Sequence, residues 1–229
     1  MAKNHLTRLA APKTWHIKRR GELFITKPDA GPHSLSLCMP LNVLLKEVLH
    51  YANTTGEIKK VLRSNEIKID GKSRKNFRFP VGIFDTIEFT GLKEHFRVML
   101  SSQGQICMVK ISKEESLLKP SKIIGKTMVK GKLQLNLYDG KNILADNKSY
   151  KVGDTLLLSL PDQKIKQHLK LDKKSAIFLI GGKHIGEVGN VEDIIENKII
   201  YRDNKENLVE TSKKYAFVIG DQKPLITLE

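Results

Sequence analysis

The sequence predicts an α+β fold divided into several small domains. Its 229 residues, 40% of them hydrophobic, are enough for two or three packed cores. Apolar residues at three-and-four spacing predict helices over residues 41–52 and from Thr55 onward, while alternating stretches with frequent turns predict strands over most of the remainder. The predicted parts are a basic N-terminal extension (1–40), a helix-hairpin module (41–91), a central β domain (92–170) and a small C-terminal β-barrel (171–229).

The charge of the chain is strongly positive and unevenly distributed. The formal net charge is +15; residues 1–174 contain 33 Lys and Arg against 16 Asp and Glu, whereas residues 175–229 contain 7 against 9. Such an excess favours phosphate backbones or anionic membrane surfaces as partners. No apolar run approaches the roughly 18 residues that a membrane span requires, so no membrane partner is predicted. A polyanion such as a nucleic acid is the expected partner.

The first 40 residues contain four prolines and no periodic apolar pattern, which predicts an irregular, extended arm. Seven Lys and Arg oppose two acidic residues there, so we expect the arm to become ordered on its partner; a solvating tail is the alternative. Trp15, the only tryptophan, argues against a mere tail, since it can stack on a base or, as we favour, pack against the folded body. The candidate nucleic-acid contacts of the arm are Lys3, Arg8, Lys13, Trp15, Lys18, Arg19 and Arg20.

Residues 54–63 predict a helix with one apolar and one cationic face. Thr54 and Glu57 have the spacing of a capping box, in which each side chain accepts a hydrogen bond from the other residue's backbone N–H, so the helix should begin near Thr55. The apolar face consists of Ile58, Val61 and Leu62. The cationic face consists of Lys59, Lys60 and Arg63.

A basic hairpin is predicted directly after this helix. Residues 67–69 alternate as a strand, and Asp70-Gly71 is a strong tight-turn pattern. Over residues 57–78, eight Lys and Arg oppose three acidic residues, an excess that favours a polyanion over an ordinary solvated surface, which is the alternative. The hairpin's candidate contacts are Lys68, Lys72, Arg74, Lys75 and Arg78. Residues 81–89 then predict one further strand.

The central region, residues 92–170, predicts strands at 96–100, 106–111, 133–138 and 149–160. Its lysines at 110, 113, 119, 122, 126, 130 and 132 predict a second cationic surface. A further basic run at 164–174 is interpreted as a solvated face at the domain boundary.

The last part combines strands with a glycine-rich loop. Strands are predicted at 176–180, 198–201, 208–212 and 215–219, and the glycines of 181–189 allow tight turns and close approach to a partner. Neither common phosphate-loop motif is present and no helical run follows, so a nucleotide site is not expected. A small barrel or sheet is predicted.

No catalytic or metal-binding set emerges from the sequence. Seven histidines are scattered without ligand spacing, and Cys38 and Cys107 form no CxxC pair, so we expect no metal, cofactor or disulfide, and a reducing, cytoplasmic setting. An RNA-modifying enzyme remains an alternative. Its candidate acids, Asp139, Asp146 and Asp154, lie in turn-like contexts without a convergent base or nucleophile.

Four separated blocks resemble one family. They are HLTRLAAPKTWHIKRRG with GPHSLSLCMPLNVLL, then EIKIDGKSRKNFRFPVGIFDTIEF, then LIGGKHIGEVGNV, and finally FVIG. Together, in this order, they resemble the S4e family of small-subunit ribosomal proteins of archaea and eukaryotes. The resemblance implies an RNA-binding module like that of ribosomal protein S4 and a C-terminal KOW barrel. It also implies RNA contacts by the helix and hairpin cations, and by Lys183 and His184 of the glycine-rich loop.

The resemblance further implies a structural, non-enzymatic constituent of the small ribosomal subunit. Its expected partners are small-subunit rRNA and neighbouring ribosomal proteins, with no small-molecule substrate, and its expected location is on cytoplasmic ribosomes. A transient transcription or translation factor that uses the KOW-like part for protein contacts is the alternative. Such a factor would associate with polymerase, or with ribosomes only transiently.

Overall fold

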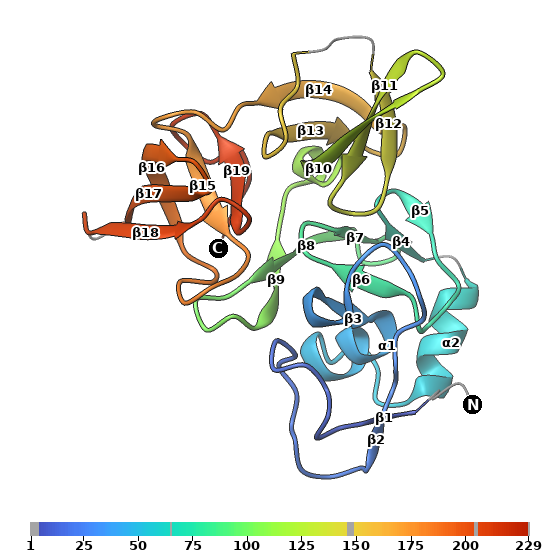
Figure 1. The fold of residues 1–229 in the computed structure, drawn as a ribbon. Helices are drawn as coiled ribbons and strands as arrows, with labels where there is room; N and C mark the ends of the chain where they lie inside the picture. Colours follow the sequence, from blue (N-terminus) through green and yellow to red (C-terminus); the bar gives the residue numbers. More distant parts are fainter. Residues whose placement is uncertain (1–4, 65, 146–148, 204–205, 229) are drawn as a thin grey trace. The chain divides into compact units, whose positions relative to one another are not determined.

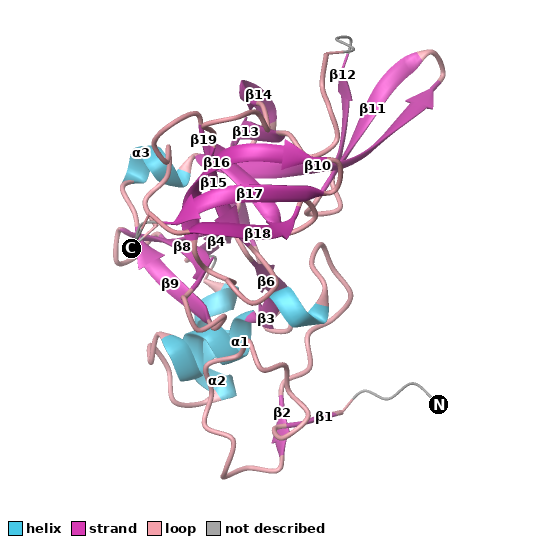
Figure 2. Ribbon diagram, turned by 60° about the vertical axis from the view of Figure 1, so that its left-hand side comes forward, coloured by secondary structure: helices cyan, strands magenta, loops and turns pink. Residues whose placement is uncertain are grey.

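The computed structural model describes residues 5–64, 66–145, 149–203 and 206–228. The chain divides into two compact units, the first made of residues 1–99 and 105–117 and the second of residues 100–104 and 118–229. Strands predominate in both (Figure 1), and the short helices of the described ranges all belong to the first unit (Figure 2). The fold is thus mostly β. No helix within these ranges is long and apolar enough to cross a membrane.

The N-terminal arm is folded onto the first unit. Its strands β1 (Leu6–Thr7) and β2 (Phe24–Ile25) pair antiparallel. Trp15 is only 1% exposed, and its indole Nε1 donates a 2.7 Å hydrogen bond to the carbonyl oxygen of Cys38. Packing of Trp15 is therefore confirmed, and the expectation that the arm orders only on a partner is wrong for its described residues. Burial of the large indole with its N–H satisfied stabilises the arm in place.

The first predicted helix is shorter than expected. After a 3-10 turn, η1 (Leu35–Leu37), and strand β3 (Cys38–Pro40), helix α1 (Leu41–Val43) continues as the π-helix η2 (Leu44–Val48). The helical backbone gives way near His50, whose φ of 53° is left-handed, so the prediction to residue 52 was wrong at its C-terminal end. The apolar stripe of residues 41, 44 and 45 is buried as predicted.

Helix α2 (Thr55–Arg63) begins where the sequence predicts, because the capping box forms. The Thr54 hydroxyl oxygen accepts from the Glu57 backbone N–H at 3.3 Å, and the Glu57 carboxylate accepts from the Thr54 backbone N–H at 3.3 Å. Ile58 and Leu62 are fully buried beneath the helix. The cap fixes where the helix starts, and these two residues fix which face looks outward.

The sheet of the first unit has the order β5-β4-β7-β8-β9. Its strands are β4 (Ile67–Ile69), β5 (Lys72–Ser73), β7 (Thr86–Phe89), β8 (Glu94–Leu100) and β9 (Ile106–Lys110), followed by helix α3 (Lys113–Ser116). Residues 91–92, where the sequence predicts a domain boundary, lie in the β7–β8 hairpin, so the sheet continues across them. Alternation marks strands but does not show which sheet they join.

The single strand predicted over residues 81–89 is two strands. β6 (Pro80–Gly82) pairs with β3, whereas β7 pairs with β4 and β8. Between them Phe84 has φ 66°, and the Asp85 carboxylate accepts a 2.9 Å hydrogen bond from the Gly82 backbone N–H. This buried turn moves the chain from one sheet to the other.

The second unit contains a central sheet of order β12-β11-β10-β13-β14. Its strands are β10 (Leu118–Val129), β11 (Lys132–Leu137), β12 (Asn142–Ala145), β13 (Thr155–Ser159) and β14 (Lys164–Leu169). Ile123, Leu135, Leu156 and Leu158 form its core. The sequence predicted β11 and, within a longer strand over 149–160, all of β13, but not β10, whose lysines obscure its alternation.

The C-terminal sheet has the order β18-β17-β16-β15-β19, all antiparallel. Its strands are β15 (Ala176–Leu179), β16 (Val188–Ile195), β17 (Lys198–Asp203), β18 (Leu208–Ser212) and β19 (Ala216–Gly220). Ile177, Leu179, Val191, Tyr201 and Val218 form its core. The four strands predicted here are confirmed within two residues; β16 was not predicted.

Candidate nucleic-acid interface

Helix α2 presents three cations outward. Lys59, Lys60 and Arg63 are exposed, on the side opposite buried Ile58 and Leu62. Among the described residues, neither Lys60 nor Arg63 takes part in an ion pair. Both lie in the last turn of the helix, where the negative end of the helix dipole favours cations. This face therefore offers exposed positive charge, although Lys60 also interacts electrostatically with Glu57 on the same helix.

The Phe77 ring joins the helix to the segment that follows the hairpin. The Lys59 ammonium lies 4.7 Å from the Phe77 ring centroid, and the Arg78 guanidinium lies 5.6 Å from it. Arg74 packs in the same way on Phe79, at 4.5 Å. An aromatic face attracts a cation without neutralising it, so these contacts position the charges and leave them available to an anion. Lys59 of the helix and Arg78 of the segment after the hairpin therefore meet at the Phe77 ring.

The hairpin cations differ in how far they are already compensated. Lys72 and Lys75 are exposed and form no ion pair within the described ranges. Lys68 lies 3.4 Å from Glu88, and Arg78 lies 3.9 Å from Asp29. Exposed pairs of this kind contribute at most about 1 kcal/mol, so a phosphate can compete for them.

The arm cations divide into buried and exposed groups. Arg8 is 6% exposed; its guanidinium donates to the Lys18 carbonyl oxygen and to the Glu47 carboxylate, both at 2.9 Å. Arg19 donates to three backbone carbonyls, and Trp15 lies in the core. These three candidates hold the arm together. Lys13, Lys18 and Arg20 are exposed and accessible, while Lys3 lies outside the described residues.

The end of the arm is anchored by a buried pair. His33 Nε2 lies 3.0 Å from both carboxylate oxygens of Asp85, and both side chains are almost fully buried. A Cβ added to Gly82 would lie 2.2 Å from the His33 ring, so only glycine fits beside it. Nearby, burial and then the Asp85 charge raise the pKa of Cys38 to about 12. This region is closed to solvent.

The glycine-rich loop of the second unit is shaped by its own surroundings. A Cβ at Gly181 would meet the Tyr215 ring at 2.6 Å, and one at Gly186 would meet the Ser101 carbonyl oxygen at 2.1 Å. The His184 Nδ1 lies 3.0 Å from the Glu187 carboxylate, which also accepts from the Tyr201 hydroxyl at 3.0 Å. Lys183 is exposed. The close approach that glycine permits is here made within the chain, and Lys183 is the accessible cation.

The cationic surface predicted over residues 110–132 is only partly present. Lys119 and Lys122 are buried; the Lys119 ammonium lies 3.4 Å from Asp139, and the Lys122 ammonium donates to the carbonyl oxygens of residues 213, 214 and 216 at 3.1, 3.0 and 2.6 Å. Burial, and then the charge of Lys213, lower the pKa of Lys122 to about 8. These two lysines are therefore not available to bind a polyanion at the surface.

Exposed lysines that were not among the candidate contacts lie on the outer half of the β10–β11 hairpin, which extends beyond the rest of its sheet (Figures 1 and 2). They are Lys126, Lys130 and Lys132. The sequence contained their charge, but only the hairpin shows that they are separated from the buried lysines of the same strand.

The candidate catalytic acids are structural. Asp154 is 3% exposed and holds His168 Nε2 at 2.7 Å and the Leu171 backbone N–H at 3.1 Å, while Asp139 pairs with Lys119 and Lys141. Both are buried, and each accepts a backbone N–H in its own turn, Asp139 from Lys141 and Asp154 from Lys151, in agreement with the predicted turn-like contexts. Asp146 lies outside the described residues. Among the residues that the structure describes, no three His, Cys, Asp or Glu side chains lie close enough together to hold a metal ion.

Comparison with known proteins gives consistent matches along the chain. The family model described as "Ribosomal family S4e" matches residues 92–165, and the one described as "RS4NT (NUC023) domain" matches residues 2–36. A crystal structure of the 30S ribosomal protein S4e from Thermoplasma acidophilum aligns with a TM-score of 0.67 at 29% identity, covering 81% of this chain and 95% of that one.

Two curated relatives are similar over almost their whole length. Small ribosomal subunit protein eS4 of Methanosphaera stadtmanae is 39% identical over 233 residues, covering 99% of this chain and 96% of the relative. Its counterpart in Methanocella arvoryzae is also 39% identical, over 236 residues, covering 99% and 98%. Identity at this level over the full length, with both family models matching in their proper order, shows that the chain belongs to the S4e family of small-subunit ribosomal proteins.

Proposed function

We propose that this chain is a structural constituent of the small ribosomal subunit and that it binds small-subunit rRNA through the cationic face of its first unit. The observation that carries the assignment of this surface is the set of exposed cations without ion-pair partners among the described residues. They are Lys60, Arg63, Lys72 and Lys75. Membership of the S4e family supports a place in the small ribosomal subunit, and the exposed cations support this face as the rRNA-binding surface.

The mechanism is electrostatic docking followed by recognition of RNA shape. Each phosphate that a lysine or arginine neutralises releases condensed counterions, which provides a driving force that falls with salt. Because the major groove of A-form RNA is too narrow for side chains to read, specificity comes from folded shape more than from base edges. The cations that pack on Phe77 and Phe79 suit this mode, since their positions are fixed before RNA arrives.

The remaining exposed cations extend this surface or form separate contacts. Lys13, Lys18 and Arg20 of the arm belong to the first unit, with Lys68 and Arg78 as partly compensated members. Lys183 in the second unit is the proposed contact of the KOW-like part. His184, bound to Glu187, positions that loop. The finer division into a bacterial-S4-type module and a KOW barrel is part of this proposal.

Binding to rRNA is tested with purified chain and small-subunit rRNA in filter-binding assays over a range of salt. A surface that engages about ten phosphates gives a log-log slope of roughly −7 to −9. A slope nearer zero, or equal affinity for small-subunit rRNA and an unrelated RNA of the same length, would contradict the proposal.

Membership of the subunit is tested by quantitative mass spectrometry of salt-washed small subunits from a gradient. One copy per subunit that resists moderate salt is the expected result. Loss at the first wash, with enrichment in polymerase fractions, would point instead to a transient factor. Changed uridines in rRNA incubated with the chain would point to an enzyme.

A further inference from the structure

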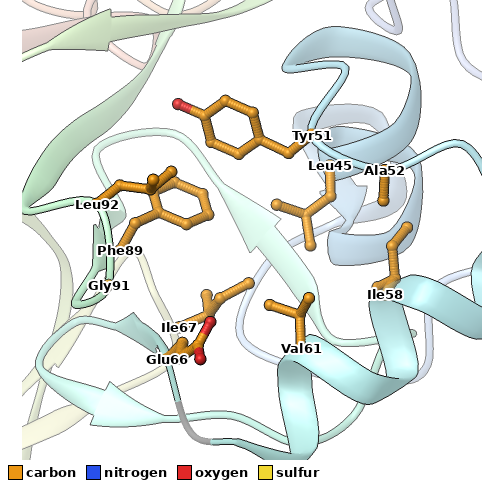
Figure 3. A pocket seen from close by; sticks show the side chains of 10 residues that line it. All are labelled: Leu45, Tyr51, Ala52, Ile58, Val61, Glu66, Ile67, Phe89, Gly91 and Leu92. Atoms are coloured by element: carbon orange, nitrogen blue, oxygen red, sulfur yellow. The ribbon is translucent and has the colours of Figure 1, made fainter.

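The first unit contains an apolar pocket of about 400 Å³ between α2, η2 with the residues that follow it, and one side of the β4–β7 pair (Figure 3). Its lining consists of Leu45, Tyr51, Ala52, Ile58, Val61, Glu66, Ile67, Phe89, Gly91 and Leu92. Its volume lies in the range of sites that bind small ligands or anchoring side chains.

The walls of the pocket are held in place. Leu45, Ile58 and Ile67 are buried in the core. The Tyr51 and Phe89 rings meet edge to face with centroids 5.0 Å apart, and the Tyr51 hydroxyl donates to Glu94 at 2.5 Å. Glu94 is in turn held by Lys110 at 2.7 Å. An occupant therefore meets a largely preformed surface, which lowers the entropic cost of binding.

The mouth of the pocket exposes apolar side chains. Leu92 is 60% exposed, Tyr51 43% and Val61 36%. All three border one hollow, so a partner that enters it can bury them together.

The charge at this pocket is opposite to that of the chain. Its lining contains one carboxylate, Glu66, and no lysine or arginine, although the chain has a net charge of +15. Glu66 is exposed, lies against Gly91, and forms no ion pair among the described residues. A nucleobase entering here would bring its phosphate toward this carboxylate, so RNA is disfavoured; a cationic peptide is complementary to it.

We propose that this pocket binds an apolar side chain from a short basic segment of a neighbouring small-subunit protein, with a lysine or arginine of that segment paired to Glu66. The inference rests on the proposed function, because it takes its partner from the ribosomal subunit. Helix α2 then serves two partners. Ile58 and Val61 line the pocket on one face, while Lys60 and Arg63 face RNA on the other.

The test is site-directed photo-crosslinking in assembled small subunits. In the full chain with Cys107→Ser, a single Leu92→Cys is labelled with benzophenone-maleimide, and the chain is reconstituted into subunits stripped of it. The matched probe is Lys60→Cys, on the opposite face of α2. We expect the residue-92 probe to crosslink to a protein segment that contains apolar and basic residues, and the residue-60 probe to crosslink to rRNA.

Each outcome decides the matter. Crosslinks from residue 92 to rRNA alone, to an acidic segment, only within the chain itself, or to nothing would overturn the pocket proposal, provided that residue 60 still crosslinks to rRNA. Failure at residue 60 would instead count against the proposed function. Glu66→Lys should lower the residue-92 protein crosslink about fivefold, as expected when an exposed ion pair is replaced by repulsion, and leave the residue-60 crosslink unchanged. An unchanged residue-92 yield would remove Glu66 from the proposal.

Discussion

The lysines of α2 are exposed, whereas the two lysines in the first half of β10, Lys119 and Lys122, are buried. Lys60 lies on a helix whose apolar face is separate, so it remains exposed. Lys122 lies in the buried half of β10, where the residues before and after it are also buried. Its ammonium donates to three carbonyl oxygens, two in the turn that precedes β19 and one in the first residue of β19. A count of positive residues therefore overestimates the attraction to a polyanion, because it includes buried lysines that a phosphate cannot reach.

The largest expected effect is the dependence of stability on pH that comes from Lys122. Its pKa in the folded chain is about 8, below the ordinary 10.5, so between these values the unfolded chain binds the proton more strongly. Stability from this group is therefore fully present above pH 10.5 and is lost as pH falls through 8, a difference of about 3 kcal/mol. Urea unfolding of wild type and Lys122→Met from pH 7 to 10.5 isolates it; parallel curves would contradict the assignment.

Removing the side chain at neutral pH has the next largest effect. Lys122→Met leaves three carbonyl oxygens without their donor, and we expect it to lower the free energy of unfolding by about 2 kcal/mol. Lys126→Met, an exposed position on the same strand, should change it by less than about 0.5 kcal/mol. Equal values from urea unfolding would show that burial does not separate the two lysines.

Removal of the exposed cations of α2 should change rRNA binding rather than stability. Lys60→Ala with Arg63→Ala should weaken rRNA affinity about tenfold and reduce the salt slope by about two, with stability nearly unchanged. The control removes the same two charges at Lys198 and Arg202, which already pair with Glu210 and Glu192. Filter binding should show less than about a twofold loss there. An equal loss in both variants would mean that net charge, not this face, governs binding.

The smallest effect concerns the helix that carries the exposed cations. Thr54→Ala removes the hydroxyl that accepts from the Glu57 N–H and should cost about 1 kcal/mol of stability. Thr54→Ser keeps the oxygen and should restore most of it. Thermal unfolding measures both; a loss in the serine variant as large as in alanine would show that the methyl group, not the cap, matters.

The features predicted correctly from the sequence are those set by neighbours in the chain. The capping box at Thr54 and the two faces of α2 depend on spacings of three and four residues, so the sequence contains them directly. The same holds for the β4–β5 turn at Asp70-Gly71, where both residues have positive φ.

The features that were missed depend on distant parts of the chain. β10 was hidden because its lysines find carbonyl and carboxylate partners about 20 to 90 residues away. Arg8 was assigned to RNA because a cation in a proline-rich arm is usually exposed, yet Glu47 lies 39 residues away in sequence and buries it. Composition does not contain such partners.

The contact between Trp15 and Cys38 makes the arm a built-in reporter of its own attachment. The only tryptophan and a closed, weakly acidic thiol meet where the arm joins the body. While the arm is docked, the indole emits from a dry site and the Cys38 thiol resists alkylation. If the arm detaches during assembly, the emission of Trp15 and the alkylation rate of Cys38 change together. The natural chain therefore carries two independent probes of one event, and arm docking can be timed without attaching a dye.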